Sequence, residues 1–525
     1  MNLSRRDFMK STGVLCGAAA TQFPWNLDAA AVDHALANRA DFAKIALARA
    51  TKLGCDYADI RINKYRRESV FTREQQVLNV SRTHDFGFGI RVLYKGAWGF
   101  AASHIVTPQS VRKVTDQAFD IARANSRYQR KAVKLVAAEK VVAQWKSAFA
   151  KDPFEVPMDK KVEFLLKLNE LAMQAKGASF VTSGLSFQNE DKFFASTDGS
   201  ETEQSIIRTL PFLTVTAVNR AAGDFQTRST LAGPKTIGYE YLEDASWAED
   251  ARKAGEEAVA KLKAKPVEPG KYDLILHPSH LWLTIHESVG HSTELDRALL
   301  WEADYAGTSF ITPDKTGKLD FGSRICNFYA DRTQPHGLAT VGYDDEGVQS
   351  QRWPLVKDGI FVDWQTTRDL APLIRATKSH GCLHSDSWGS VPFPRMPNVS
   401  LEPAKENVSL DDLLGGVDNG ILIYGNGSWS IDHQRYNFQF GGQTFWEIKN
   451  GKLGEMLRDV AYQSRTPEFW HACDGLGGPA TYELNGAAND GKGEPTQANA
   501  VSHGCPVARF RQINVLNTNP SKKTT

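Results

Sequence analysis

The sequence has few cysteines, no long apolar run and almost no net charge. Its six cysteines are scattered and form no CxxC pair, which argues against a disulfide framework. No stretch reaches the roughly 20 apolar residues needed to span a bilayer, so we expect no integral membrane segment. Because 62 Lys and Arg nearly cancel 61 Asp and Glu, there is no summed positive field to recruit nucleic acid. We therefore expect no nucleic-acid partner.

The remaining composition is that of a folded chain with more than one core. Hydrophobic residues make up 41% and aromatic residues 10%, close to the averages for globular proteins, which argues against extensive disorder. A chain of 525 residues is long for a single domain, since domains average about 150 residues. We expect at least two domains.

The first 31 residues have the features of an export signal. The stretch SRRDFMK at 4–10 precedes a short, weakly apolar run at 11–20, a pattern typical of a twin-arginine signal peptide. Small residues at 29–31 offer a cleavage point. This predicts a periplasmic or secreted protein that is exported already folded, and the alternative is an ordinary basic N-terminal tail.

Residues 32–265 predict an N-terminal α/β domain with a sheet and packed helices. Four segments carry apolar residues at helical spacing, and alternating runs between them predict strands. The helical segments are 33–53, 107–124, 158–176 and 246–263. The strand-like runs include 57–63, two runs within 85–103 about a Lys95-Gly96 turn, and 179–188, 191–200 and 209–220. Pro266 and the Pro269-Gly270 pair then mark a domain boundary.

Residues 266–525 predict a second domain that is mainly β. A strand at 272–276 is followed by a helix from His280, with Ser279 as the expected N-cap. Beyond residue 300, turn residues separate short alternating strands. The fold class expected for the whole chain is α+β. We expect the functional residues of the second domain on the one helix at its start.

That helix carries His286, Glu287 and His291, an HExxxH pattern. In a regular α-helix, residues five apart point about 140° away from each other, so the two histidines would not share a face. Gly290 permits a wider turn, and a π-bulge there would bring the rings together. A zinc hydrolase needs three protein ligands and a nearby general base. His286 and His291 fit as ligands and Glu287 fits as the base toward the metal-bound water, whereas the plain alternative is a partly exposed helix.

Several further motifs resemble the TldD branch of the TldD/PmbA metallopeptidases. They are HESVGHSTELDR (286–297), EADYAGTSF (302–310), RMPNVSL (395–401), SWSIDHQRYNFQFGG (428–442) and VSHGCPVARF (501–510). The resemblance implies a β-rich C-terminal domain that carries zinc. It also implies cleavage of unstructured peptides between paired subunits, in a homodimer or in a heterodimer with another TldD/PmbA-family chain.

The third ligand departs from the pattern of this branch. Where the branch has a Cys in a stretch like NCGKGQP, this chain reads NDGKGEP at 489–495, which makes Asp490 the matching residue. A carboxylate keeps the ligand's charge and binds zinc well, with manganese, iron or cobalt as alternatives. Other candidates in the same region are Cys505, His503 and Cys473, or the third ligand is lost.

These observations lead to two main hypotheses. The first is a metal-dependent peptidase, with zinc as the expected metal, that hydrolyses unstructured peptides. The second is a catalytically inactive TldD-like peptide-binding or scaffold subunit that supports an active partner. A weaker third is a maturation factor that trims one secreted peptide.

Overall fold

The computed structural model describes residues 37–519, so the predicted signal peptide at 1–31 lies outside the described residues. All the elements named below belong to one compact unit, residues 39–525. The fold is α+β, as the sequence predicts. Among residues 37–519, no helix combines the length and the apolar character needed to cross a membrane.

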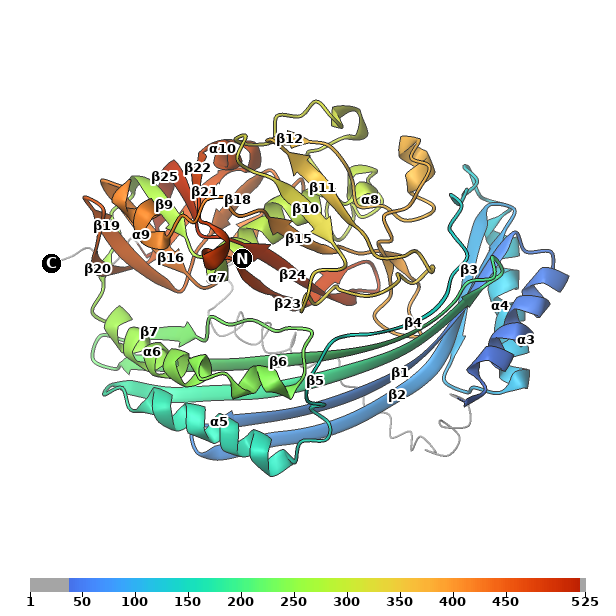
Figure 1. Cartoon of the computed structure of the whole chain (residues 1–525), viewed down its shortest axis with the longest axis horizontal. Coiled ribbons are helices and arrows are strands. Elements are labelled where there is room, and N and C mark those ends of the chain that lie inside the picture. The colour runs from blue at the N-terminus through green and yellow to red at the C-terminus, as the bar shows by residue number, and fades with distance from the viewer. Residues whose placement is uncertain (1–36, 520–525) are drawn as a thin grey trace, which may run out of the picture. The chain divides into compact units, whose positions relative to one another are not determined.

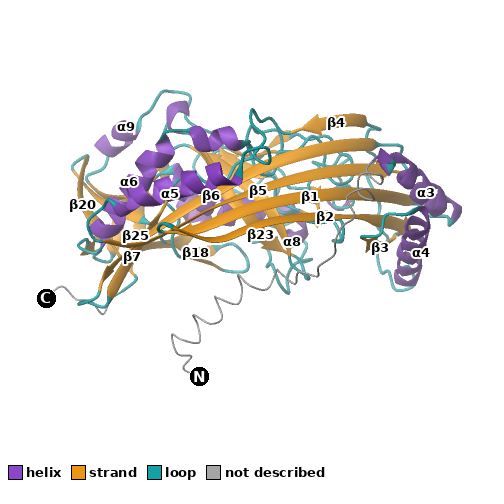
Figure 2. Cartoon of the chain, turned by 90° about the horizontal axis from the view of Figure 1, so that it is seen from below, coloured by secondary structure: helices purple, strands orange, loops and turns teal. Residues whose placement is uncertain are grey.

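A seven-stranded sheet of unusually long strands forms the N-terminal half. Its strand order is β3-β2-β1-β5-β6-β4, and β7 pairs with β6. Figure 2 shows β1, β2, β5 and β6 running alongside one another. The strands are β1 (Tyr57–Arg73), β2 (Gln76–Tyr94), β3 (Ala97–Ser103), β4 (Val142–Lys146), β5 (Ala178–Ser196), β6 (Glu201–Asn219) and β7 (Asp224–Ser229).

Strand β5 is continuous where the sequence predicts a break near residue 190. The polar run QNEDK is typical of a turn, but here Glu190 and Lys192 are both buried within the strand. Lys192 lies 2.7 Å from Asp345, and Arg208 lies 3.3 Å from Glu190. Because partners distant in the chain neutralise these charges, the strand can pass through a polar stretch.

Four helices accompany this sheet (Figure 1). They are α3 (Arg39–Lys52), α4 (Pro108–Asn125), α5 (Met158–Met173) and α6 (Ser246–Lys261). Leu165 of α5 and Trp247 of α6 share a core with Val181, Leu185 and Phe187 of β5. Alternate residues of a strand point to opposite faces. The odd-numbered face of β5 therefore packs on helices, while Glu190 and Lys192 lie on the other face.

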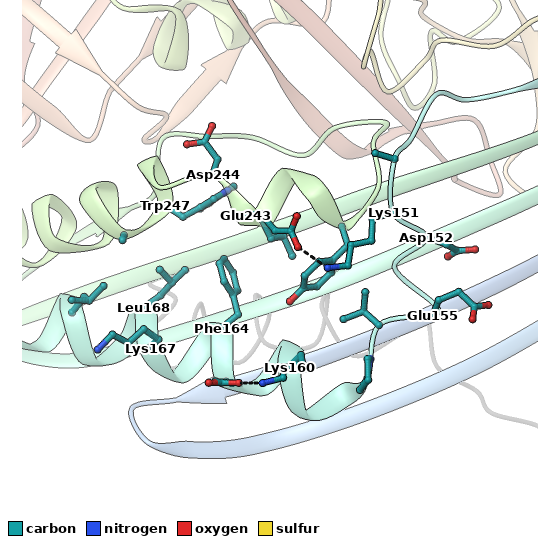
Figure 3. Close-up of a pocket in the computed structure, with 18 residues that line it drawn as sticks. Lys151, Asp152, Glu155, Lys160, Phe164, Lys167, Leu168, Glu243, Asp244 and Trp247 are labelled. Atoms are coloured by element: carbon teal, nitrogen blue, oxygen red, sulfur yellow. Dashed lines mark hydrogen bonds and ion pairs between the residues drawn. The ribbon is translucent and has the colours of Figure 1, made fainter.

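A cavity lies within this N-terminal half. It measures about 890 Å³ and is lined by α5, the short helix η1 (Tyr239–Glu243) and the start of α6. Figure 3 shows Phe164, Leu168 and Trp247 on its wall, with exposed charges such as Lys160 at its edge. None of the predicted site residues lines this cavity.

The C-terminal half is built on a ten-stranded sheet. The order is β17-β18-β21-β25-β9-β16-β19-β20-β8, with β22 paired to β25. These strands are β8 (Lys265–Pro266), β9 (Gly270–Leu276), β16 (Asn419–Tyr424), β17 (Trp429–Ile431), β18 (Asn437–Phe440), β19 (Thr444–Lys449), β20 (Lys452–Arg458), β21 (Val460–Arg465), β22 (Cys473–Leu476) and β25 (Ala508–Asn517). The mainly β prediction for this half is confirmed.

Smaller sheets and short helices complete this half. The strands are β10 (Phe328–Asp331), β11 (Arg352–Lys357), β12 (Ile360–Phe361), β13 (Leu383–His384), β14 (Phe393–Pro394), β15 (Asn398–Leu401), β23 (Glu483–Lys492) and β24 (Gln497–Cys505). The helices are α7 (Pro278–Ile285), α8 (Leu295–Ala298), α9 (Leu410–Gly415), α10 (Thr466–His471), η4 (Pro313–Lys315), η5 (Ala371–Ile374) and η6 (Pro479–Thr481). A buried core that includes Leu281, Ile285 and Val289 surrounds the α7 segment, so rigid packing holds the candidate site.

Candidate metal centre

The helix that carries the motif starts two residues earlier than the sequence predicts, at Pro278 instead of His280. His277, rather than Ser279, is the N-cap: its Nδ1 accepts the Ser279 N–H at 3.2 Å, and Pro278 occupies the first helical turn. Proline is favoured there because it has no N–H to leave unsatisfied. The predicted Ser279 cap is therefore wrong. Its hydroxyl instead accepts the Gly425 N–H at 3.1 Å, which ties the helix to the end of β16.

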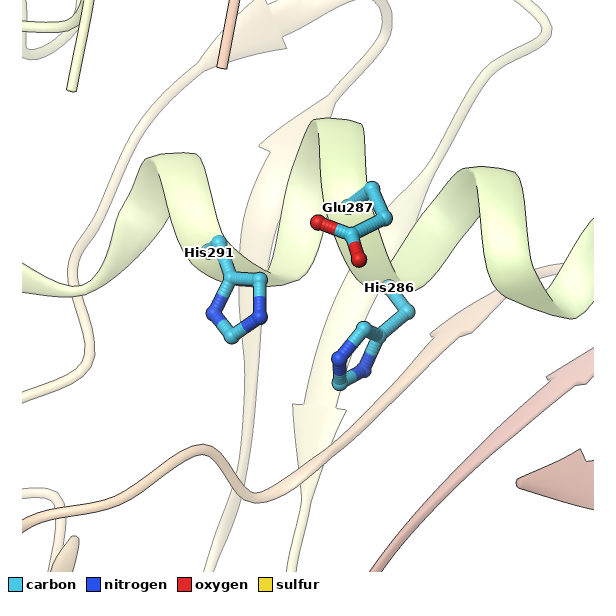
Figure 4. Close-up of side chains that lie close together, drawn as sticks. All are labelled: His286, Glu287 and His291. Atoms are coloured by element: carbon cyan, nitrogen blue, oxygen red, sulfur yellow. The ribbon is translucent and has the colours of Figure 1, made fainter. Parts of the chain in front are cut away.

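The predicted π-bulge is present. Residues His286–Gly290 (η2) form a π turn in which the His291 N–H reaches the His286 carbonyl, five residues back. A short 3₁₀ turn, His291–Thr293 (η3), follows. The two imidazole centroids lie 4.5 Å apart at an interplanar angle of 71°, and Figure 4 shows both rings on the same side of the helical segment. The wider turn thus brings His286 and His291 onto one face.

Gly290 serves close packing rather than unusual backbone geometry. Its φ of −55° is open to any residue, so the turn does not need glycine for its conformation. A Cβ at this position would lie 2.5 Å from the Met396 sulfur. The absence of a side chain therefore allows the loop before β15 to approach the π turn.

Asp490 faces both histidines. Its Oδ1 lies 3.6 Å from the Nε2 of His286 and 3.6 Å from the Nε2 of His291. The guanidinium of Arg395 holds the other side of the residue, donating to Oδ2 at 3.1 Å and to the backbone carbonyl. Burial opposes ionisation, but His291, His286 and Arg395 outweigh it and keep the pKa of Asp490 well below its usual range. Asp490 is therefore a carboxylate.

A hydrogen-bond chain fixes the tautomer of His286. The Val399 carbonyl can only accept, so His503 Nδ1 donates to it at 2.7 Å. Burial lowers the pKa of His503 well below its usual value, which keeps the ring neutral and makes its Nε2 an acceptor. The Nδ1–H of His286 donates to that Nε2 at 2.8 Å. Burial lowers the pKa of His286, but Asp490 outweighs burial and raises that pKa above its usual value. In the neutral form that binds a metal, the lone pair of His286 lies on Nε2, the atom that faces Asp490.

Glu294 orients His291 in the same way. Its carboxylate accepts the His291 Nδ1–H at 2.7 Å, which again leaves the lone pair on Nε2. Burial would raise the pKa of Glu294, but Arg297 and Lys492 outweigh it and hold that pKa well below its usual range. Lys492 also lies 2.7 Å from Asp296. Such carboxylate–histidine pairs orient the ligands in metal sites.

Glu287 completes a compact buried group with the histidines. Ligand atoms of His286, Glu287 and His291 all lie within 4.8 Å of one another. The Oε2 of Glu287 accepts a hydrogen bond from Arg435 Nη1 at 2.6 Å. A second nitrogen of Arg435 donates to the Ala306 carbonyl at 2.9 Å. The Glu287 carboxylate thus lies close to both imidazole rings.

The other predicted candidates for the third ligand lie elsewhere. His503 meets His286 on its Nδ1 side, away from Asp490. The Cys505 sulfur lies 3.9 Å from the Pro278 carbonyl at the start of α7, and Cys473 is a buried core residue at the start of β22. Of the four candidates, only Asp490 approaches the Nε2 atoms of both histidines.

Sequence reasoning gave no role to Glu294, Arg435 or Arg395, although all three lie in the motifs quoted above. One local signal existed for Glu294, because it follows His291 by three residues and such pairs meet on a helical turn. No such signal exists for Arg435, which contacts Glu287 across 148 residues of sequence.

Models of one protein family match most of the chain. Family models described as PmbA/TldA metallopeptidase match three segments: domain 1 at residues 58–122, the central domain at 151–262 and the C-terminal domain at 269–517. Together they cover most of the chain, and the last contains every residue of the candidate centre.

Whole-length relatives carry metalloprotease names. A metalloprotease of Methanocaldococcus jannaschii is 26% identical over 440 residues, which cover 84% of this chain and 94% of the relative. A zinc metalloprotease TldD homolog of Saccharolobus solfataricus is 22% identical over 473 residues, which cover 89% and 98%. The crystal structure of TldE from Thermococcus kodakarensis shares the fold, with a TM-score of 0.70 at 18% identity over 92% of this chain and 99% of that one. The chain belongs to the PmbA/TldD metallopeptidase family.

Proposed function

We propose that this protein is a metal-dependent peptidase of the TldD branch, in which His286, His291 and Asp490 bind the metal and Glu287 is the general base. The observation that carries this proposal is the convergence of two Nε2 atoms on one carboxylate oxygen beside a second carboxylate. The metalloprotease names of the relatives support it.

The donor set fits zinc. Nitrogen and oxygen ligands about 2.0–2.2 Å from a tetrahedral zinc lie roughly 3.3–3.6 Å apart. Each Nε2 lies 3.6 Å from Asp490 Oδ1, which is too long for a hydrogen bond and close to that spacing. When bound, zinc supplies a Lewis acid that polarises the peptide carbonyl and acidifies water. With two neutral imidazoles and one carboxylate as ligands, zinc keeps a net positive charge, which supports its role as a Lewis acid.

Glu287 transfers the proton in the proposed reaction. Its carboxylate accepts a proton from water as the water oxygen bonds to the scissile carbonyl carbon. As the carbon–nitrogen bond breaks, Glu287 returns this proton to the departing nitrogen, which leaves as a free amine. One peptide bond and one water thus become a carboxylic acid and an amine, which exchange a proton to give a carboxylate and an ammonium, and Glu287 ends as it began.

The substrate class and the setting follow from the same family assignment. We infer that substrates are unstructured peptides that bind in an extended conformation along strand edges. Such binding uses the peptide backbone and depends little on the substrate's side chains. Pairing with a second family chain, identical or different, is part of this proposal, and the likeness to TldE of Thermococcus kodakarensis is consistent with such a relative. The twin-arginine pattern at 4–10 supports export to the periplasm or beyond.

A scaffold role is the second candidate function, and one observation favours it. Both acidic groups of the centre already have a cationic partner, since Arg435 lies 2.6 Å from Glu287 and Arg395 lies 3.1 Å from Asp490. A centre that had lost its metal could be held together by such pairs alone.

Metal content and Glu287→Gln separate the two candidates. Protein purified without added zinc should contain about one metal ion per chain and cleave unfolded peptides. Glu287→Gln should keep the metal and lose turnover by about 10²–10⁴-fold, the usual contribution of a general base. Glu468→Gln, at an exposed ion pair with Arg465, is the matched control and should behave like the wild type. Well-folded wild-type protein without metal would support the scaffold instead.

A further inference from the structure

Arg435 is the polar partner of the proposed general base. We propose that Arg435 is a positioning residue. It donates a hydrogen bond to one carboxylate oxygen of Glu287, so that the other oxygen is directed at the attacking water. The inference rests on the proposed function, because it assigns the group that acts through Glu287. It adds a residue from a distant hairpin to the catalytic arrangement.

The backbone at Arg435 is held in an uncommon conformation. Its φ is +63°, in the left-handed region that side chains other than glycine adopt at a cost of about 1–2 kcal/mol. The turn between β17 and β18 enforces it: the Arg435 N–H donates to the Asp432 carbonyl, and the Asp432 carboxylate accepts the N–H groups of Tyr436 and Asn437. Thr466 donates to the Arg435 carbonyl at 2.7 Å. Strain of this kind persists where the surroundings fix the residue and is common at functional sites.

A second segment holds the guanidinium from the other side. The backbone of 306–310 runs against the turn, and the Thr308 N–H donates to the His433 carbonyl at 2.7 Å. The Phe310 N–H donates to the Gln434 carbonyl at 2.8 Å. This places the Ala306 carbonyl where it accepts from Arg435 Nη2 at 2.9 Å, while Nη1 donates to Glu287 at 2.6 Å. The planar fork is therefore fixed at two nitrogens.

A fixed fork controls the orientation of Glu287. The last torsion of a glutamate side chain is broad, so an unheld carboxylate can rotate away from a reacting group. The Arg435 contact involves Oε2, which leaves Oε1 as the oxygen for water. Because a shift of about 1 Å in a reacting group can cost about 10²-fold in rate, this constraint has a kinetic consequence.

The competing explanation is a purely structural ion pair. Glu287 is 3% exposed, and removing the partner of a buried charge destabilises a protein strongly whatever its role. The two explanations differ in their predictions. A structural pair predicts that stability, metal content and activity fall together, whereas a positioning residue predicts a loss of kcat in folded, metal-loaded protein and a gain when a small guanidinium replaces the missing side chain.

The test uses the full-length protein with zinc and an unfolded peptide substrate. Arg435→Ala is compared with Arg435→Lys, which keeps the charge but not the fork, and with Glu287→Gln. The matched control is Arg465→Ala, because Arg465 lies on the strand paired with the same hairpin and forms an exposed ion pair. For each variant kcat, KM, zinc per chain and thermal stability are measured, with and without guanidinium chloride at millimolar concentration. A crystal structure of Arg435→Ala supplies a readout that does not depend on activity.

We expect Arg435→Ala to lose about 10²-fold in kcat at nearly unchanged KM and zinc content, and to recover about tenfold or more with guanidinium. Arg435→Lys should fall between, Glu287→Gln should show no rescue, and the Glu287 carboxylate should occupy more than one rotamer in the Arg435→Ala crystal. A kcat within about threefold of the wild type, or a joint loss of zinc, stability and activity without rescue, would overturn the inference. If wild-type protein lacks metal-dependent activity, the proposed function fails, and a single unchanged Glu287 rotamer in that crystal would then overturn the positioning role separately.

Discussion

Two of the regions in which the protein buries charged side chains are organised differently. Where the long sheet meets residues 344–346, acidic and basic groups contact each other directly: Lys192 lies 2.7 Å from Asp345 and 3.1 Å from Glu190. At the metal centre, the nitrogens of His286 and His291 face Asp490 at 3.6 Å. The first region pairs its charges with one another, whereas the second aims its lone pairs at a common point.

This difference separates structural from functional burial. A paired buried charge has its partner within the fold, so its removal changes stability. Converging donors are useful only for a ligand that they bind together, so their removal should change binding. Substitutions in the first region should therefore change stability, and substitutions in the second should change metal binding.

The largest effect is expected from Asp490→Ala. Loss of one of three ligands should weaken zinc binding by more than the roughly 10–100-fold typical of residues that only orient ligands, and it should abolish peptidase activity. Zinc affinity is measured by competition with a chromophoric chelator. The control is Asp345→Asn in the other region, which should lower stability and leave zinc affinity unchanged. Equal zinc affinity in Asp490→Ala and wild type would remove Asp490 from the site.

The second prediction concerns pH and the paired region. Burial would raise the pKa of Glu190, but Lys192 and Arg208 outweigh it and lower that pKa to about 2, against an ordinary value of 4.5. The folded state therefore binds this proton less readily, and the ionised group contributes stability at neutral pH. That contribution is complete above about pH 4.5 and is lost as the pH falls toward about 2.

Glu190→Gln isolates this contribution. Removing the charge should cost about 3 kcal/mol at pH 7, the energy of a pKa difference of this size, as measured by urea unfolding. The difference from wild type should shrink as the pH falls through the window below 4.5. Zinc content should not change. A difference that is constant from pH 7 to pH 3 would show that the charge of Glu190 is not what stabilises this region.

The sequence predicts these two regions unequally well. The π turn follows from one local fact, the five-residue spacing between His286 and His291. The Lys95-Gly96 turn joining β2 and β3 follows from local residues in the same way. The continuity of β5 does not, because Glu190 and Lys192 are neutralised by Arg208 and Asp345, and no local pattern identifies those partners.

The centre shows the same limit. His503 contacts His286 across 217 residues of sequence, so its role in holding a tautomer becomes visible only once β24 lies beside the helix. Gly290 was assigned a conformational role because glycine often relaxes the backbone. The true reason is the nearby Met396, a contact that single-sequence reasoning does not reveal.

The third prediction is His503→Ala. The variant leaves the Nδ1–H of His286 without an acceptor, so it should weaken zinc binding by about 10–100-fold, as expected for a residue that orients a ligand. The matched control is His280→Gln on the same helix. His280 is equally buried and bonds Tyr462 and the Gly425 carbonyl, so its loss should lower stability without changing zinc affinity. If both variants lose zinc affinity equally, destabilisation of the helix alone would explain the loss. The distinction between the two regions would then weaken.

The smallest effect is expected from Gly290→Ala, and it tests why the π turn forms. Alanine suits the φ of −55° and favours helical backbone by about 1 kcal/mol over glycine, but its Cβ would meet the Met396 sulfur at 2.5 Å. Overpacking of this kind costs about 1–3 kcal/mol, and the flexible end of a methionine can move, so the net loss of stability should be about 1 kcal/mol or less. Whatever zinc affinity Gly290→Ala loses through this clash should be restored when Met396→Ala is added to it. If the double variant binds zinc no better than Gly290→Ala, glycine is required by the backbone itself. The His286–His291 geometry would then depend on local conformation rather than on packing from the loop before β15.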